Sequence, residues 1–197
     1  MAEAPLKPPP VRAFLAIPLL EIFPQTIEKL LRPLEREIPG IRWVVPQQVH
    51  LTLHFFGLVA ANEIELIHGF SKKVASLFSP LRLMLGPIGG FPSLERPDLI
   101  WLGVGEPTGR LLSLQKAIQG EARTLGFRTE ARPFLPHATI GRVKRKNVDL
   151  KPLLARSPSG SFGPEKIADH FLLYQSHCRP EGARYEVLQT YPLTKKT

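Results

Sequence analysis

The sequence predicts an α+β protein in which antiparallel sheets are flanked by helices. Short runs of alternating apolar and polar residues recur along the chain, and this alternation is typical of strands with one buried face. Amphipathic helical segments separate these runs, but without the regular order of a βαβ repeat. A strand motif, His-x-Thr, occurs once in each half, as His50-Leu51-Thr52 and His137-Ala138-Thr139. We therefore expect a pseudo-symmetric site that takes one histidine from each half.

The N-terminal part begins with a proline-rich stretch. Residues 1–10 predict a flexible arm, and residues 11–197 a single domain. The alternating sequence of residues 11–18 is typical of a strand. Apolar residues then recur at helical spacing over residues 21–37, which predicts a helix kinked at Pro33.

The middle of the first half holds two predicted strands, residues 41–45 and residues 49–58. A helix should follow from Asn62, with Glu65 as its capping-box partner. The apolar positions that this helix should bury are Leu66, Phe70, Val74 and Leu77.

The second half repeats a similar order of elements. Residues 81–85 and 98–104 predict strands joined by a loop rich in glycine and proline, and residues 108–126 predict a helix that ends at a glycine. A weak helix is expected at residues 148–154. Residues 166–191 then predict a hairpin that closes the chain.

The first motif strand gives the expected site its geometry. Alternation places Leu51, Leu53 and Phe55 in the core, with His50 and Thr52 together on the other face, about 6 to 7 Å apart. The same alternation places His54 on the site face as a third imidazole. In the second strand, His137 and Thr139 likewise share one face.

Chance alone explains two such motifs poorly. Six histidines and nine threonines in 197 residues give roughly 0.3 accidental His-x-Thr triplets (6 × 9/197). The alternative is that each pair is only the polar side of a half-buried strand, where threonine is favoured anyway.

Two histidines across a cleft can act as an acid and a base near neutral pH. Threonine hydroxyls are short, neutral donors that suit the oxygens of a phosphate held between them. This set favours in-line displacement at phosphorus, in which one histidine activates the nucleophile and the other protonates the leaving oxygen. A 2′,3′-cyclic phosphate suits this chemistry, because its alkoxide leaving group needs a proton and its ring is strained.

The charge balance favours polyanionic partners. Lysine and arginine outnumber aspartate and glutamate by 26 to 17, for a net charge of +9. The densest basic run, which includes Lys144, Arg145 and Lys146, directly follows the second motif, where it could hold RNA backbone. A well-solvated surface is the alternative interpretation.

Other classes of protein find little support in the sequence. No apolar run is long enough to cross a membrane and no secretory signal is visible, so we expect a cytoplasmic protein without a membrane partner. Cys178 is the only cysteine, which excludes an intrachain disulfide, and we expect it to be passive. Residues 103–109 superficially resemble a dinucleotide loop, but Glu106 would face the pyrophosphate, so a turn is expected. His50 and His54 would be about 13 Å apart on a strand, too far to share a metal ion.

Taken together, the motifs resemble those of the two-histidine (2H) phosphoesterase superfamily. Within it, the chain is similar to the RNA 2′,3′-cyclic phosphodiesterases, also called 2′-5′ RNA ligases. The resemblance rests on His50-Leu51-Thr52-Leu53 with Phe55-Phe56-Gly57, and on Pro136-His137-Ala138-Thr139-Ile140-Gly141-Arg142. It extends over about residues 11–193 through Arg12-Ala13-Phe14-Leu15-Ala16-Ile17, Trp43, Ile100-Trp101-Leu102-Gly103, Tyr185 and Tyr191-Pro192-Leu193.

The resemblance implies a bilobal, pseudo-twofold fold with the site in the groove between the lobes. It also implies metal-independent opening of a terminal 2′,3′-cyclic phosphate to a 2′-phosphate, without a cofactor. By position, His50 would donate a proton to the 3′ oxygen, His137 would activate water, and Thr52 and Thr139 would bind the phosphate. Arg142 would assist only if a bulge at Gly141 turned it toward the site. His54 departs from the family, where another basic or polar residue is common.

Three functions remain open at this point. The first is an RNA 2′,3′-cyclic phosphodiesterase, and the second is ATP-independent 2′-5′ ligation by the same residues. The third is a non-catalytic module that binds RNA ends, which two intact motifs disfavour. The expected partners are RNA with a 2′,3′-cyclic phosphate end or a small cyclic nucleotide, and the expected state is a monomer.

Overall fold

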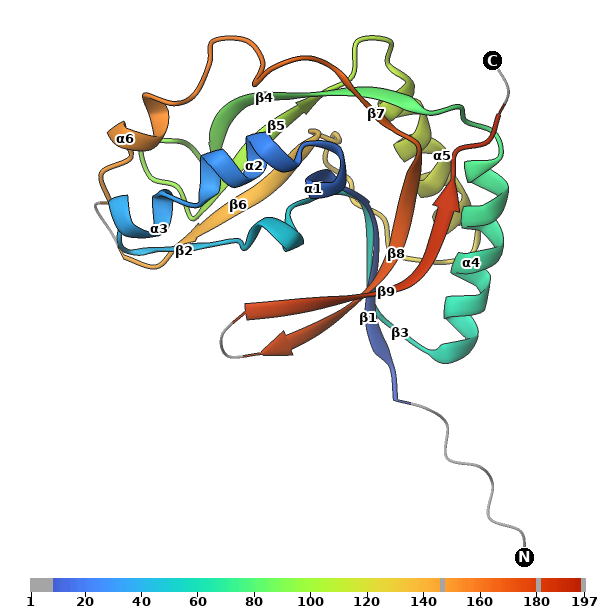
Figure 1. Cartoon of the computed structure of the whole chain (residues 1–197). Coiled ribbons are helices and arrows are strands. Elements are labelled where there is room, and N and C mark those ends of the chain that lie inside the picture. Colours follow the sequence, from blue (N-terminus) through green and yellow to red (C-terminus); the bar gives the residue numbers. More distant parts are fainter. Residues whose placement is uncertain (1–8, 146–147, 180–181, 196–197) are drawn as a thin grey trace, which may run out of the picture.

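Two antiparallel sheets form the framework of the protein (Figure 1). The computed structural model describes residues 9–145, 148–179 and 182–195. The strands of the first sheet, in spatial order, are β3 (His50–Val59), β1 (Val11–Pro18), β8 (His170–Arg179) and β9 (Gly182–Pro192). Those of the second sheet are β2 (Ile41–Trp43), β6 (His137–Val143), β5 (Leu99–Gly105), β4 (Leu81–Phe91) and β7 (Lys166–Ala168). The α+β class with antiparallel sheets is confirmed.

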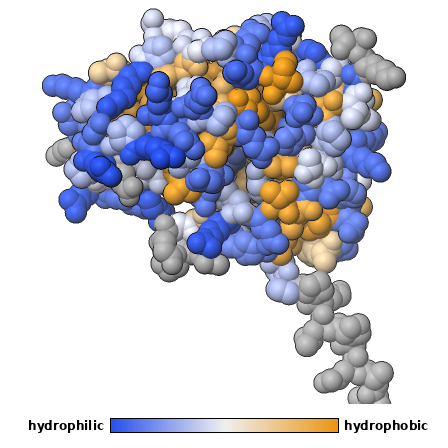
Figure 2. All heavy atoms as spheres, viewed as in Figure 1, coloured by the Kyte–Doolittle hydropathy of each residue, from blue (hydrophilic) through white to orange (hydrophobic). Residues whose placement is uncertain are grey.

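Helices pack on both sheets. The two long ones, α4 (Ala61–Ala75) and α5 (Arg110–Thr124), pack against each other and against strands of the first sheet, on the right of Figure 1. The short helices are α1 (Leu19–Ile22), α2 (Pro24–Leu31), α3 (Leu34–Glu37) and α6 (Lys151–Leu154), with a 3₁₀ turn, η1 (Pro46–Gln48). One apolar cluster runs through both sheets and these helices. Hydrophilic side chains cover most of the face in Figure 2, around smaller apolar patches.

The prediction of a single kinked helix over residues 21–37 is wrong. The segment forms three helices, because proline lacks the N–H that continues a helix. Pro24 is therefore the first residue of α2, and Pro33 lies in the break before α3. The apolar residues at helical spacing nevertheless face the core, since Ile27, Leu31 and Leu34 are buried.

The helix expected from Asn62 exists as α4, but its details differ. It begins one residue earlier, and its cap is formed by Glu63, whose carboxylate accepts from the N–H of Ala60 at 2.6 Å. Phe70 and Val74 are buried as predicted. Leu66 is exposed, and Ile67 is buried in its place. Leu77 is also exposed and lies beyond the end of α4, so the prediction is right for two of its four positions.

The loop predicted after residue 85 is mostly strand. β4 continues to Phe91 through three glycines and a proline, with an irregularity between Leu85 and Ile88 where it pairs with β5. Residues 103–105 complete β5, and residues 106–109 form the expected turn. There, Glu106 caps α5 by accepting from the N–H groups of Arg110 and Leu111, so the helix begins at Arg110 rather than Thr108.

The two sheets share one internal pattern, which relates the halves. β1 pairs with β3 as β5 pairs with β6, and β8 then pairs with β1 as β4 pairs with β5. Thr52 lies opposite Ala16, and Thr139 lies opposite Trp101 in the equivalent register. The pseudo-twofold relation predicted from the repeated motif therefore extends over three strands of each sheet.

In the part of the chain that the structure describes, none of the helices is long and apolar enough to cross a membrane.

Candidate active site

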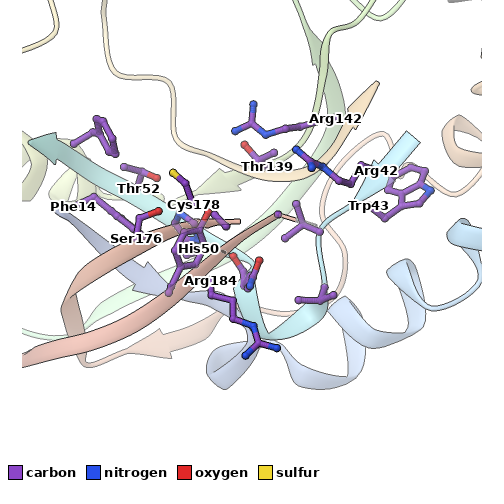
Figure 3. A pocket seen from close by; sticks show the side chains of 17 residues that line it. Phe14, Arg42, Trp43, His50, Thr52, Thr139, Arg142, Ser176, Cys178 and Arg184 are labelled. Carbon is purple, nitrogen blue, oxygen red and sulfur yellow. Dashed lines mark hydrogen bonds between the residues drawn. The ribbon is translucent and has the colours of Figure 1, made fainter. Parts of the chain in front are cut away.

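The two motif strands, β3 and β6, come together where the sheets meet. Beside them lies a cavity of about 670 Å³, lined by His50, Thr52, Thr139 and Arg142 among other residues. Figure 3 shows Thr52 and His50 on one side of this cavity and Thr139 and Arg142 on the other. The fold therefore brings together motif residues that are 87 positions apart in the sequence.

Each motif strand carries a bulge directly after its threonine. In β3, Thr52 pairs with Ala16 and His54 with Leu15, so Leu53 has no partner. In β6, Thr139 pairs with Trp101 and Gly141 with Ile100, so Ile140 has no partner in β5. One extra residue reverses the alternation of the strand beyond it. The two halves thus share a His-x-Thr motif together with the bulge that follows it.

The bulge in β6 explains how the side chain of Arg142 reaches the cavity. With ideal alternation, this side chain would point away from the face of His137. The unpaired Ile140 turns it back, and Arg142 lines the cavity with Thr139. The sequence predicts that Arg142 reaches the site only through a bulge at Gly141, and the bulge lies one residue earlier, at Ile140. Gly141 is buried, and a Cβ there would come within 2.8 Å of the Ile41 side chain.

The bulge in β3 makes two expectations wrong. Phe55, expected in the core, is 43% exposed and lines the cavity. His54, expected on the site face, is only 5% exposed and packs in the core against Phe56. The alternation used for the prediction is valid only for a strand without a bulge. His50 and His54 consequently lie on opposite faces of the sheet.

Burial lowers the pKa of His54, while a hydrogen bond to the backbone of Arg128 and the charge of Glu130 act in the opposite direction. Its Nε2 has no hydrogen-bond partner among the described residues. His54 therefore belongs to the packing behind the site rather than to the site.

The two motif histidines are held in the same orientation. Nδ1 of His50 lies 2.7 Å from the carbonyl oxygen of Gln48, and Nδ1 of His137 lies 2.7 Å from that of Leu135. A carbonyl oxygen only accepts, so Nδ1 is the protonated, donating nitrogen in both rings. Nε2 is then the nitrogen that can take or give a proton at the cavity.

Aromatic side chains surround His50. Phe14 lies 4.9 Å from it between ring centroids, and Tyr185 meets it edge-on at 5.1 Å. The pKa of His50 is lowered to about 4, chiefly by burial; the hydrogen bond to the Gln48 carbonyl acts to raise this pKa and the nearby charge of His137 acts to lower it. His50 is therefore neutral at neutral pH in the free protein, and His137 is close enough for the two charges to interact.

His137 lies in a more open setting. Phe91 contacts it edge-on at 5.2 Å, and Trp101 lies 6.1 Å away. In the register of the two sheets, Phe91 holds the place that Tyr174 holds near His50. The two histidines differ in their relation to the cavity, since His50 lines it and His137 does not.

Hydroxyl and guanidinium groups suited to an anion complete this centre. Thr52 and Thr139 offer hydroxyl donors from opposite sides, and Arg142 offers a fixed positive charge. The charge of Arg142 also reaches Tyr185, where it partly offsets the rise in pKa that burial causes. The arrangement can hold a phosphate between the two threonines and Arg142, beside the imidazole of His50.

The basic run lies at the edge of this centre. The N–H groups of Lys144 and Arg145 both donate to the carbonyl oxygen of Gly40, and their side chains are exposed. Neither lines the cavity, and Lys146 lies outside the described residues.

Several cavity residues were not predicted as part of the site. They come from β1, β2 and the β8–β9 hairpin and are Phe14, Arg42, Tyr185, Cys178 and Arg184. Tyr185 contributed to the family resemblance, but no spacing rule ties it to a histidine 135 residues away. Cys178 lies in a C-terminal strand as expected, and it also lines the cavity.

Among the described residues, no three His, Cys, Asp or Glu side chains group as ligands for a metal ion.

Comparison with known proteins adds evidence that is independent of this geometry. Residues 23–167 match the family model described as the 2′-5′ RNA ligase superfamily. The chain is 31% identical over 181 residues to a protein of Archaeoglobus fulgidus named RNA 2′,3′-cyclic phosphodiesterase, covering 92% of this chain and 99% of that one.

Solved structures agree with this match. The crystal structure of the Thermus thermophilus protein TT0787 superposes with a TM-score of 0.78 at 27% identity, over 94% of this chain and 100% of that one. The structure of E. coli LigT complexed with 3′-AMP has a TM-score of 0.74 at 25% identity, over 94% of this chain and 99% of that one. The fold and the family inferred from the motifs are thus confirmed.

Proposed function

We propose, from the premise that this chain belongs to the 2′-5′ RNA ligase superfamily, that it is an RNA 2′,3′-cyclic phosphodiesterase. Curated relatives of Archaeoglobus fulgidus and Methanocaldococcus jannaschii, each 31% identical over 92% of this chain, carry that name. The observation that carries the proposal is the duplicated His-x-Thr-bulge unit, whose two copies hold their histidines by the same hydrogen bond and place both threonines at one cavity. The substrate is RNA with a 2′,3′-cyclic phosphate end, or a small cyclic nucleotide.

The reaction is hydrolysis of one ester bond of the cyclic phosphate. Water attacks phosphorus and loses a proton to Nε2 of His137, while the P–O3′ bond breaks and Nε2–H of His50 protonates the departing 3′ oxygen. The products are a 2′-phosphomonoester and a 3′-hydroxyl. Thr52, Thr139 and Arg142 hold the non-bridging oxygens, and the proton returns to His50 through solvent before the next turnover.

The pKa of His50 sets a condition on this assignment. With a pKa of about 4, only about one free molecule in a thousand carries the required proton at pH 7. A phosphate anion beside the imidazole favours its protonated form, so the bound substrate raises this pKa. Substrate binding and protonation of His50 are therefore coupled in the proposed mechanism.

The family description supplies a second candidate, ATP-independent 2′-5′ ligation. In this reaction a 5′-hydroxyl replaces water as the nucleophile, and the products are a 2′-5′ phosphodiester and a 3′-hydroxyl. The two histidines keep their roles, with His137 taking the proton of the 5′-hydroxyl and His50 protonating the departing 3′ oxygen. Only the supply of 5′-hydroxyl ends relative to water separates the two reactions.

The test is incubation with a short RNA that ends in a 2′,3′-cyclic phosphate, followed by chromatographic identification of the product isomer. The expected product is the 2′-phosphate, formed equally well in excess chelator. A 3′-phosphate would contradict the assignment of the leaving oxygen. Activity that disappears with chelator and returns with Zn²⁺ or Mg²⁺ would overturn the metal-free mechanism. Joined RNA in the presence of 5′-hydroxyl ends would favour the ligase.

A further inference from the structure

The pseudo-twofold relation between the two sheets fails in two places, and both border the cavity. The first sheet ends at β3, whereas the second continues past the equivalent strand β6 to one further strand, β2. The outer strand β9 runs for 11 residues, whereas its counterpart β7 runs for 3. The symmetric parts carry the histidines and threonines, so the unmatched parts need another explanation.

These unmatched elements face each other across the cavity. One wall is formed by the chain from β2 to η1, with Val44, Val45 and Gln48, and the other by the outer end of the β8–β9 hairpin. Figure 3 shows Cys178 and Arg184 on the hairpin opposite Arg42. We call this part of the cavity the slot and define it by Val44, Val45, Gln48, Cys178, Ala183 and Arg184.

The slot begins beyond the reacting centre. Tyr185, which contacts the His50 ring, pairs with Ser176, and Ala183 pairs with Cys178. Two residues along a strand correspond to about 7 Å. The slot therefore begins about 7 Å outward from Tyr185 along the hairpin. The cavity of about 670 Å³ is on the scale that takes a whole drug-sized ligand, more than a cyclic phosphate ring needs.

The side chains of the slot suit a nucleotide. Val45 is 52% exposed and, with Ala183, offers apolar contact to the flat face of a base. Gln48 can pair with base edges, and the exposed Arg184 can bind a phosphodiester. An RNA chain that ends in a cyclic phosphate continues in only one direction. Such a ligand requires a binding surface that extends from the symmetric centre on one side only.

We propose that the slot binds the nucleotide that precedes the terminal cyclic phosphate, with its base between Val45 and Ala183 and the connecting phosphate on Arg184. This inference rests on the proposed function and specifies its substrate as an oligonucleotide end rather than a mononucleotide. The unmatched strand β2 and the long hairpin are then the parts of the fold that make an RNA end the preferred substrate.

The test compares kcat/KM for a mononucleoside 2′,3′-cyclic phosphate with that for a dinucleotide ending in the same group. The wild type should prefer the dinucleotide by about tenfold or more, and Arg184→Gln should lower this preference about tenfold. Ala183→Leu, which fills the slot, should lower it as well. Arg123→Gln, a change of the same kind on the exposed end of α5, should leave both substrates unaffected.

A wild type without preference for the dinucleotide would overturn the inference. Equal losses on both substrates in Arg184→Gln would also overturn it, because they would place this residue at the reacting centre or in the fold.

Calorimetric binding separates this inference from the proposed function. A dinucleotide with a terminal 2′-phosphate should bind the wild type about tenfold more tightly than a nucleoside 2′-phosphate does, and Arg184→Gln should abolish the difference. A protein that hydrolyses neither cyclic substrate but shows this difference would refute the proposed function alone. Equal affinities for the two phosphates would refute the slot.

Discussion

His50 and His137 are held by the same hydrogen bond. Each imidazole donates Nδ1–H to the carbonyl oxygen of the residue two positions earlier, at 2.7 Å in both cases. This bond leaves Nε2 of both rings for proton transfer and fixes the ring orientation without a side-chain partner. Their surroundings differ, since aromatic rings bury His50 and lower its pKa, while His137 is more open. The following predictions use this difference.

Removal of either histidine should nearly abolish activity. His50→Ala and His137→Ala should each lower kcat by about 10²- to 10⁴-fold, the range typical of a general acid or base. Steady-state kinetics on a 2′,3′-cyclic phosphate measure this loss. The double variant should be little worse than the poorer single one, because both groups serve one transition state. Losses that multiply would show that the two histidines act independently.

A sulfur leaving group should reveal which histidine is the acid. When the 3′ oxygen of the cyclic substrate is replaced by sulfur, the departing thiolate needs no proton. His50→Ala should therefore recover most of its lost rate on this substrate, while His137→Ala should stay as impaired as before. Single-turnover rates on the oxygen and sulfur substrates provide the comparison. Recovery in His137→Ala instead would exchange the two roles.

The pH dependence should carry the signature of buried His50. The profile of kcat/KM should be bell-shaped, with an acid limb near pH 4, since the lower of the two macroscopic pKa values belongs mainly to His50. Activity is lost below this limb because both histidines then carry protons and no base remains. NMR titration of the His50 ring should give the same value in the free protein.

A variant that exposes His50 should shift this limb. Tyr185→Ala removes a ring that covers the imidazole, so the pKa of His50 should rise toward its ordinary value near 6.5 and the acid limb should move to higher pH. Val187→Ala, at an exposed position two residues farther along β9, is the matched control. An unchanged limb in Tyr185→Ala would mean that burial by Tyr185 does not cause the shift.

The basic run should hold RNA backbone rather than take part in chemistry. Replacement of Lys144, Arg145 and Lys146 by glutamine should weaken binding of RNA longer than a few nucleotides. The slope of log affinity against log salt should fall by up to about three phosphate contacts. Filter binding over a range of salt concentrations measures this slope. Losses of equal size on a mononucleoside cyclic phosphate would instead place these residues at the reacting centre or in the fold.

The sequence alone determined the class of fold, the repeated motif and the candidate acid–base pair. These features depend on local regularities, since alternation of apolar and polar residues places His50 with Thr52 and His137 with Thr139 on strand faces. The helices were found for the same reason, although prolines divided the first one and shifted caps altered the starts of α4 and α5.

Tertiary structure decided which other residues reach the site. A bulge arises from the pairing of two strands, so alternation within one strand cannot reveal that Leu53 and Ile140 are unpaired. Those two bulges bury His54, expose Phe55 and turn Arg142 into the cavity. Likewise, Tyr185 and Arg184 reach the site only because β8 and β9 add to the edge of β1. Residue type and spacing along one strand follow from the sequence, whereas the pairing of distant strands depends on how the whole chain packs.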